Sequence, residues 1–419
     1  MDIFKTADIL IPKQDKDFSK WSVVACDQYT SEPEYWTDVK GIVGNDTSTL
    51  NMIFPEVYLE DDGADERIAA INKTMGEYLS SGVFEELKDA YIYVEREQSD
   101  GKIRCGVVGM VDLDAYDYSK GSQSPVRATE GTILERIPPR QRVRRNAPLE
   151  LPHIMLLADD INNEIIAPLA DKTGEMRKIY DFKLMKGSGH IKGWLIDGAA
   201  KAEFDAALDA LLARKNAETL PDGKRPLIFA VGDGNHSLAT AKSCWEELKQ
   251  TLTDEEAESH PARYALCELV NLYDSALVFE PIHRAVFDIE PEKMMNALFE
   301  YYPNASYDNN GGQEIRYAYG NNEGTVYIKD GKSNIPVGSI QAFIDDYLSK
   351  NGGRVDYIHG EGVTKKLAAA DGCIGFMVGA MDKTELYPTV IADGSLPRKT
   401  FSMGEAADKR FYLEAKRIK

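Results

Sequence analysis

Residues 226–242 read P-L-I-F-A-V-G-D-G-N-H-S-L-A-T-A-K, and this stretch is the strongest local indication of the fold. Leu227 to Val231 form a short apolar run, partly β-branched, that is typical of a buried strand. The segment from Gly232 to Ser237 follows with two glycines, and the next residues, A-T-A-K-S-C-W-E-E-L, are good helix formers. The sequence therefore predicts a buried strand that turns through glycine directly into a helix.

Such a turn is a candidate anion site. It leaves backbone N–H groups at the positive end of the helix dipole, where phosphate is the commonest ligand. The alternative interpretation is an ordinary strand-to-helix turn with Asp233 or Ser237 as the N-cap. The spacing matches neither a P-loop nor a G-x-G-x-x-G fingerprint, so it identifies no particular nucleotide-binding fold.

The length and charge of the chain limit its partners. At 419 residues it is long enough for two or three domains and a substantial core. Its 49 basic and 69 acidic residues give a net charge of −20. Nucleic acid and anionic membranes both require a cationic face, so neither is expected as a main partner. A small anionic ligand is compatible with this charge where basic residues are concentrated locally.

The sequence also predicts a cellular compartment. The first residues, M-D-I-F-K-T-A-D, lack the cationic and apolar regions of a signal peptide, and no apolar run reaches the length of a transmembrane helix. The five cysteines are odd in number, widely spaced and never arranged as C-x-x-C. We therefore expect reduced thiols, no structural zinc and a cytoplasmic protein.

Helix and strand signals alternate along the chain, which indicates an α/β or mixed α+β protein with a mixed sheet. Residues 64–90 predict an amphipathic helix, and the two apolar runs on either side of Ser99-Asp100-Gly101 predict a hairpin. Residues 120–152 are rich in proline and predict an irregular segment. The pattern changes near residue 286, which predicts a first domain of residues 1–285 and a smaller α/β domain of residues 286–419.

Five arginines lie within ten residues of this acidic chain, in R-I-P-P-R-Q-R-V-R-R (136–145). Arginine is suited to bidentate capture of phosphate, so Arg136, Arg140 and Arg142 are candidate phosphate contacts. Glu130 shortly precedes them and adds a carboxylate beside the cations. The alternative is a solvated loop whose arginines pair with surface acids.

Two acidic residues and one histidine are candidates for proton transfer. Asp27 and Glu32 lie on a polar turn after a buried strand, a common place for a general base or a magnesium ligand. Either residue could equally be a helix cap or a surface acid. His236 is the histidine of most interest because it follows the glycine turn. The sequence contains neither H-E-x-x-H nor G-x-S-x-G, so a zinc or serine hydrolase has little support.

Six stretches of the chain together resemble the family called domain of unknown function 1015. As an ordered set they extend from about residue 21 to residue 402. They are V-V-A-C-D-Q-Y-T-S-E-P-E-Y-W, T-E-G-T-I-L-E-R-I-P-P-R, V-G-D-G-N-H-S-L-A-T-A, F-E-P-I-H-R-A-V, V-D-Y-I-H-G and L-P-R-K-T-F-S-M. Members are often described as ParB-like, because their D-G-H-H-R-Y turn resembles the phosphate-holding turn of ParB, sulfiredoxin and the free serine kinases. The resemblance implies a ParB/sulfiredoxin-like nucleotide-binding core with a second, smaller α/β domain.

The resemblance also implies site residues. Asp233, Gly234 and His236 match the family's turn, whereas Asn235 stands where the family has His and Ser237 where it has Arg. The missing arginine would have contacted a phosphate directly.

Other positive side chains could take the place of that arginine, namely an arginine of residues 136–145 or Lys242. In the free serine kinases a glutamate near the N-terminus acts as the base on the serine hydroxyl. Glu32 and Asp27 are nearest to that glutamate by position.

These observations lead to two functional hypotheses. The first is a kinase that uses ATP or ADP and Mg²⁺ and transfers a phosphoryl group to a small hydroxylated metabolite such as free serine. Gly232 to Ser237 would hold the phosphates with the arginines, Asp233 or Glu130 would bind Mg²⁺, and Glu32 or Asp27 would accept the proton, with His236 beside them. The second hypothesis is a non-catalytic binding protein that responds to a nucleotide or phosphate. A DNA-binding role has less support, because the chain is acidic and has no basic helix.

Overall fold

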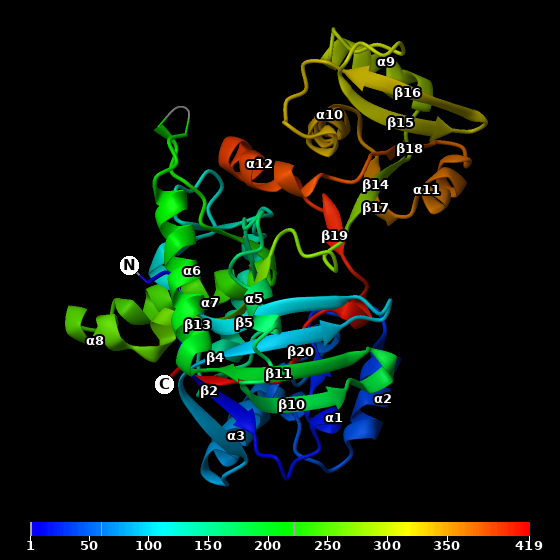
Figure 1. Ribbon diagram of the computed structural model, residues 1–419. Helices are drawn as coiled ribbons and strands as arrows, with labels where there is room; N and C mark the ends of the chain where they lie inside the picture. The colour runs from blue at the N-terminus through cyan, green and yellow to red at the C-terminus, as the bar shows by residue number, and fades with distance from the viewer. Residues whose placement is uncertain (1, 60, 221–222) are drawn as a thin grey trace. The chain divides into compact units, whose positions relative to one another are not determined.

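The computed structural model describes residues 2–59, 61–220 and 223–419, and the chain forms two compact units (Figure 1). The first unit combines residues 1–277 with residues 405–419, and the second contains residues 278–404. Both units contain helices and sheets, so the fold class is mixed α+β, as the sequence predicts.

The division between the units differs from the predicted one in two places. The boundary lies before residue 286 because Phe279–Phe287 is strand β14, which pairs with strands of the second unit. The sequence placed residues 405–419 in the second domain, but these residues pair with strands of the first unit. Neither pairing has a signal in the local sequence, because both join segments that are distant along the chain.

An eleven-stranded mixed sheet forms the framework of the first unit. Most neighbouring strands are antiparallel. The exceptions are β9 (Met155–Ala158), which is parallel to β13 (Tyr264–Asn271), and β7 (Val126–Ala128), which is parallel to both β12 (Phe229–Asp233) and β6 (Tyr116–Asp117). From edge to edge the strands are β10 (Arg177–Lys183), β11 (His190–Ile196), β4 (Phe84–Glu97), β5 (Ile103–Asp112), β13 (Tyr264–Asn271), β9 (Met155–Ala158), β12 (Phe229–Asp233), β7 (Val126–Ala128) and β6 (Tyr116–Asp117), with β1 (Phe4–Lys5) beside β5 and β2 (Ala7–Pro12) beside β4. The predicted hairpin, β4–β5, and the predicted strand before the glycine turn are confirmed.

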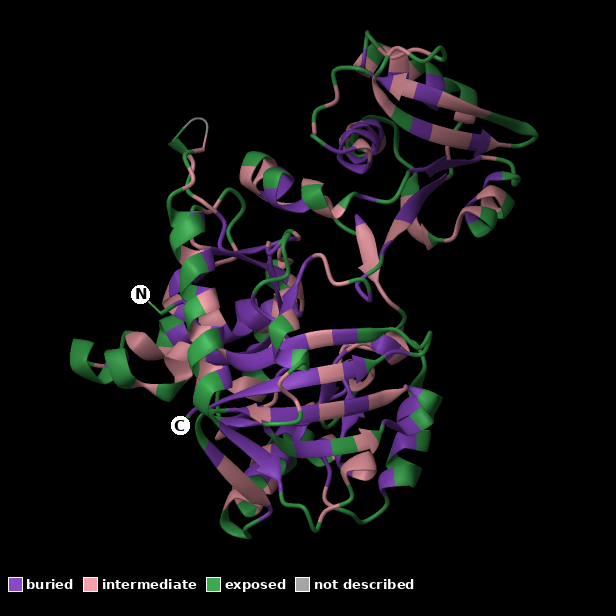
Figure 2. Ribbon diagram, viewed as in Figure 1, coloured by how far each residue is buried: buried purple, intermediate pink, exposed green. Residues whose placement is uncertain are grey.

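The central strands of the sheet are buried on both faces and are largely purple in Figure 2. Successive residues of a strand point to opposite faces. In β4, Tyr91 and Tyr93 belong to one hydrophobic cluster, and Ile92 and Val94 belong to another. The first cluster contains side chains of helices α6 (Gly198–Asn216) and α7 (Asn235–Lys249). The second contains side chains of α1 (Phe18–Trp21), α2 (Pro33–Val43) and α3 (Ala64–Ser80). This arrangement explains why Ala90 to Val94 of β4 form a continuous apolar run.

The helices of the first unit correct two predictions. They are α1 (Phe18–Trp21), α2 (Pro33–Val43), α3 (Ala64–Ser80), α4 (Ile137–Arg144), α5 (Ala167–Ala170), α6 (Gly198–Asn216), α7 (Asn235–Lys249) and α8 (Asp254–Ser259). The helix predicted over 64–90 ends at Ser80, because Gly82 takes a left-handed φ of +71° and β4 begins at Phe84. The arginine segment is not irregular but is helix α4, whose prolines lie in the first turn, where a missing N–H costs nothing.

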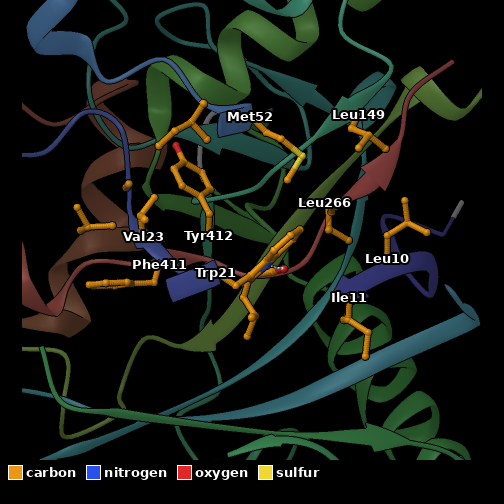
Figure 3. Packing of buried hydrophobic residues seen from close by; sticks show 14 of the residues in the cluster. Leu10, Ile11, Trp21, Val23, Met52, Leu149, Leu266, Phe411 and Tyr412 are labelled. Carbon is orange, nitrogen blue, oxygen red and sulfur yellow. Dashed lines mark hydrogen bonds between the residues drawn. The ribbon is translucent and has the colours of Figure 1, made fainter. Parts of the chain in front are cut away.

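The C-terminal residues 405–419 complete the core of the first unit. Strand β20 (Phe411–Tyr412) pairs with β3 (Val23–Val24), and β21 (Lys416–Arg417) pairs with β8 (Leu149–Glu150). Figure 3 shows Phe411 and Tyr412 among side chains from distant parts of the chain, including Trp21, Met52 and Leu266. The tail is therefore part of the packed interior.

The second unit is built on a six-stranded antiparallel sheet. Its strands are β16 (Asn322–Ile328), β15 (Gln313–Tyr319), β18 (Cys373–Met377), β14 (Phe279–Phe287) and β17 (Arg354–His359), with β19 (Phe401–Met403) beside β14. Its helices are α9 (Pro291–Tyr301), α10 (Pro336–Asn351), α11 (Glu361–Ala368) and α12 (Leu386–Asp393). The predicted order of helix, two strands, helix, strand and helix is confirmed up to α11.

Two further expectations concern the membrane and the thiols. In the part of the chain that the structure describes, no helix combines the length and the apolar character needed to cross a bilayer. All five cysteines are free, as expected from their spacing.

Candidate functional site

The candidate site is centred on the turn between β12 and α7. The helix begins at Asn235, and its N-cap is Gly234, with a φ of +76°, rather than Asp233 or Ser237. Only glycine adopts this conformation without strain. A Cβ atom on Gly234 would lie 3.0 Å from the Cα of Ile154, so this glycine also permits close packing on the segment before β9. The first turn of α7 therefore presents its backbone amides at the C-terminal end of β12.

Two side chains of the turn hold a neighbouring segment. Asn235 Oδ1 accepts a hydrogen bond from the Thr129 amide at 3.2 Å, and His236 Nε2 accepts one from the Ile133 amide at 3.3 Å. These contacts fix the stretch that contains Glu130 beside the start of α7. Asn235 and His236 thus have a clear positioning role for that stretch.

His153, just before β9, connects three other groups. Its Nε2 lies 2.9 Å from Ser237 Oγ and 3.7 Å from Asp27 Oδ2, and its Nδ1 lies 2.7 Å from the Tyr412 hydroxyl oxygen. The Tyr412 contact orients the ring so that Nε2 faces the turn and Asp27. This is not the order of a hydrolase triad, because the carboxylate and the serine share one ring nitrogen.

Lys409 of the C-terminal tail adds a positive charge. Its Nζ lies 3.2 Å from Asp233 Oδ2, while Asp233 Oδ1 accepts a hydrogen bond from the Gly234 amide at 2.9 Å. Burial raises the pKa of Asp27, but the charge of His153, the hydrogen bond from Gln28 and the charge of Lys409 outweigh it and hold that pKa below its usual value. Asp27 is therefore ionised at neutral pH.

The arginines of α4 have different positions. Arg140 lies 2.5 Å from Glu56 and lines a pocket that also contains Ser237 and His153. Arg142 pairs with Asp65 at the start of α3 and is half-exposed. Arg136 is exposed, and its carbonyl accepts a hydrogen bond from Arg140 at 2.7 Å. Only Arg140 among these three shares the pocket with residues of the turn.

The structure separates the two candidate acids. Asp27 lies beside His153, whereas Glu32 is exposed as the N-cap residue of α2 and makes no capping hydrogen bond through its side chain. Lys242, the possible substitute for the family's arginine, pairs with Glu246 at 2.5 Å.

Three residues of the site were missed from the sequence: His153, Lys409 and Tyr412. The position of His153 shortly before β9 is a weak signal, because five other histidines compete with it. Lys409 and Tyr412 had no usable signal, since the sequence placed the C-terminal residues in the other domain.

The fold and the site define a mixed α+β protein with a strand–glycine–helix turn surrounded by ionisable side chains. The chain belongs to the family described as "Protein of unknown function (DUF1015)", whose model matches residues 7–347. No curated protein matches it.

Several solved structures resemble the chain remotely. A conserved hypothetical protein from Pyrococcus furiosus is 10% identical, with 73% of this chain and 90% of that chain covered and a TM-score of 0.34. SbnI with a C-terminal truncation, from Staphylococcus aureus, is 10% identical, with 71% and 83% covered and a TM-score of 0.36. A free serine kinase in complex with AMP is 9% identical, with 73% and 90% covered and a TM-score of 0.38.

Proposed function

We propose that the protein binds the phosphate groups of ATP or ADP at the β12–α7 turn and transfers a phosphoryl group to the hydroxyl of a small molecule. One observation carries this proposal: Asp27, His153 and Lys409 come from three distant parts of the chain to the N-terminus of α7. A base and positive groups at a helix N-terminus suit phosphoryl transfer, which depends mainly on positioning and charge neutralisation. The ParB-like resemblance of the turn supports the same assignment.

In this proposal the backbone of Gly232 to Ser237 contacts the phosphates, and Lys409 neutralises their charge. Asp27 accepts the proton of the acceptor hydroxyl, whose oxygen attacks the terminal phosphorus. The bond from that phosphorus to the bridging oxygen breaks, and the shortened nucleotide leaves with the electron pair. Asp27 can serve as the base because it is ionised, although its lowered pKa makes it a weaker base than an ordinary carboxylate.

The predicted Mg²⁺ site does not fit the arrangement of Asp233. Mg²⁺ needs available oxygen ligands in octahedral geometry. One carboxylate oxygen of Asp233 accepts a hydrogen bond from the Gly234 amide, and the other forms an ion pair with Lys409. The proposal therefore gives charge neutralisation to Lys409 and assigns no step to a metal at Asp233.

The second candidate function is a non-catalytic binding protein that responds to a nucleotide or phosphate. Ser237 favours it, because this residue replaces the family's arginine and contacts His153. Under both proposed functions we place the protein in the cytoplasm, because a reducing compartment keeps cysteines such as these five free.

A ligand screen with a lysine variant tests phosphate binding. We expect ATP, ADP, CTP or pyrophosphate to raise the melting temperature, since a ligand at a hundred times its dissociation constant adds about 2.7 kcal/mol. Lys409→Met should weaken nucleotide binding roughly 10- to 100-fold, because a charged hydrogen bond is lost. Lys88→Met, which removes an exposed paired lysine, is the matched control. Equal affinities in the two variants, or no shift with any of the four ligands, would contradict the phosphate site.

Asp27→Asn separates the enzyme from the binding protein. The substitution keeps the shape and removes the base, so we expect turnover to fall by about 10²-fold or more while ATP affinity is retained. Glu32→Gln, at an exposed position, should change turnover little. Turnover of the unmodified protein and of both variants is measured as ADP release in the presence of a panel of alcohols as phosphoryl acceptors. Turnover that survives in Asp27→Asn would remove Asp27 from the mechanism, and ATP binding without turnover in the unmodified protein would favour the binding function.

A further inference from the structure

A pocket of about 150 Å³ lies in the first unit beside the start of α7. Its walls come from the short helical segments around residues 52–59, from α4, from residues 147–154 and from the tail. Most of the lining is apolar and includes Met52, Phe54, Val143, Leu149, Leu151 and Ile154. Figure 3 shows Met52, Leu149 and Tyr412 within one packed cluster. A cavity of ~150 Å³ lined by such side chains accommodates a molecule the size of benzene.

Two uncharged hydroxyl groups line the pocket where it meets the turn. Ser237 and Tyr412 contribute hydroxyl groups on either side of the His153 ring. Burial and the nearby charges of Asp27 and Glu56 raise the pKa of the Cys26 thiol, so that group is also neutral. This end of the pocket can hydrogen-bond a hydroxyl group and lies next to Asp27.

The charged residues of the lining already neutralise one another. Arg140 pairs with Glu56 at 2.5 Å, and Arg144 pairs with Glu150 at 2.6 Å. A ligand carboxylate would have to displace a partner from one of these arginines, and a ligand ammonium would have to displace an arginine. In both cases the charged group of the ligand loses its hydration, while the number of ion pairs in the pocket does not increase.

From these three features we infer that the pocket binds the acceptor, an uncharged small molecule with an apolar body the size of an aromatic ring and one hydroxyl group directed at Ser237 and His153. A zwitterion such as free serine does not suit it. That the bound hydroxyl group accepts a phosphoryl group rests on the proposed function. Binding of the small molecule in the pocket does not require a nucleotide.

Binding of benzyl alcohol, benzoate and free serine to the full chain, followed by titration NMR, tests this inference. We expect benzyl alcohol to bind with a dissociation constant of about 1 mM. Benzoate and serine should bind at least tenfold more weakly. Leu151→Phe and Leu151→Trp extend a half-buried side chain into the pocket and should weaken benzyl alcohol binding at least tenfold. Ile161→Trp, at a position 67% exposed, is the control for added bulk and should bind like the unmodified protein.

Several outcomes would overturn the inference. They are tighter binding of benzoate or serine than of benzyl alcohol, no binding of benzyl alcohol, or unchanged binding in a folded Leu151→Phe variant. ATP binding, measured on the same samples, separates this result from the proposed function. ATP binding without benzyl alcohol binding removes the pocket assignment alone. Benzyl alcohol binding without ATP binding retains the pocket and removes the kinase.

Discussion

Replacing Arg410 with methionine is expected to lower the free energy of unfolding by about 3–5 kcal/mol at neutral pH. Arg410 is buried and pairs with Glu268 and Glu414, whose side chains are both fully buried. Its Nε also donates to the Pro152 carbonyl at 3.3 Å. Methionine fills much of the same volume but leaves two buried carboxylates with less compensation. Urea denaturation of both proteins measures the difference.

The loss of unfolding free energy in Arg410→Met should depend on pH, and the pKa of Glu268 determines whether it grows or shrinks as the pH rises. Burial raises the pKa of Glu268, but the charges of Arg104 and Arg410 outweigh it, so the folded-state pKa lies below its usual value. In the unmodified protein this carboxylate stabilises the fold above its unfolded-state pKa, and that contribution disappears as the pH falls through the folded-state pKa. Without Arg410 the folded-state pKa should rise above the unfolded value. Glu268 then opposes folding at neutral pH, and protonation relieves the penalty as the pH falls.

The difference in stability between Arg410→Met and the unmodified protein should therefore be larger at pH 8 than at pH 5. Arg417→Met is the matched control on the same tail, because Arg417 is 44% exposed and pairs with Glu86. That variant should lose less than about 1 kcal/mol. Two results would contradict the proposed pairing role of Arg410. One is an equal loss of unfolding free energy in both variants, and the other is a loss in Arg410→Met that is larger at pH 5 than at pH 8.

The tail connects this stability to the site. Arg410 lies between Lys409, which faces Asp233, and Tyr412, which orients His153. Anchoring Arg410 on Glu268 of β13 therefore fixes the two residues that complete the candidate site. Any loosening of the tail should weaken ligand binding before the sheet unfolds.

The parts of the fold that the sequence predicted well are those with local signals. The β12 strand, its glycine turn and α7 are consecutive, and so are β4 and β5 around their turn. Hydrophobic periodicity and turn residues are sufficient for such elements. The prolines of 138–139 misled the interpretation of α4, because proline breaks a helix interior but is tolerated in a first turn.

The site was predictable only in part for the same reason. Asp233 and Gly234 were found because they lie in the turn itself. His153 and Lys409 reach the turn through pairing of β9 with β12 and through the return of the tail, and neither event has a local pattern. Asp27 and Glu32 look alike in sequence, yet only Asp27 faces His153. The chain turns between the two positions, and Glu32 lies in solvent directly before α2, which begins at Pro33.

Gly234→Val is expected to destabilise the protein by about 3 kcal/mol and to abolish nucleotide binding. A φ of +76° is costly for any residue with a Cβ atom, and more so for a β-branched one. The added Cβ would also lie 3.0 Å from Ile154 Cα and 3.2 Å from its Cγ1, so the turn must move away from the segment before β9. That movement displaces the amides that would contact the phosphates. Urea denaturation and ATP titration at low temperature, with Gly234→Ala as the milder variant, measure the two effects.

Gly121→Val separates the strain of the backbone from the close approach. Gly121 has a nearly identical φ of +79°, but a Cβ atom there meets nothing within 4 Å. This control should therefore lose only the conformational part, about 1–2 kcal/mol, and should bind ATP normally. The excess loss in Gly234→Val then reports the contact with Ile154. If folded Gly234→Ala and Gly121→Val bind ATP equally well, the turn has no role in phosphate binding, and Gly234 serves only to pack α7 against the segment before β9.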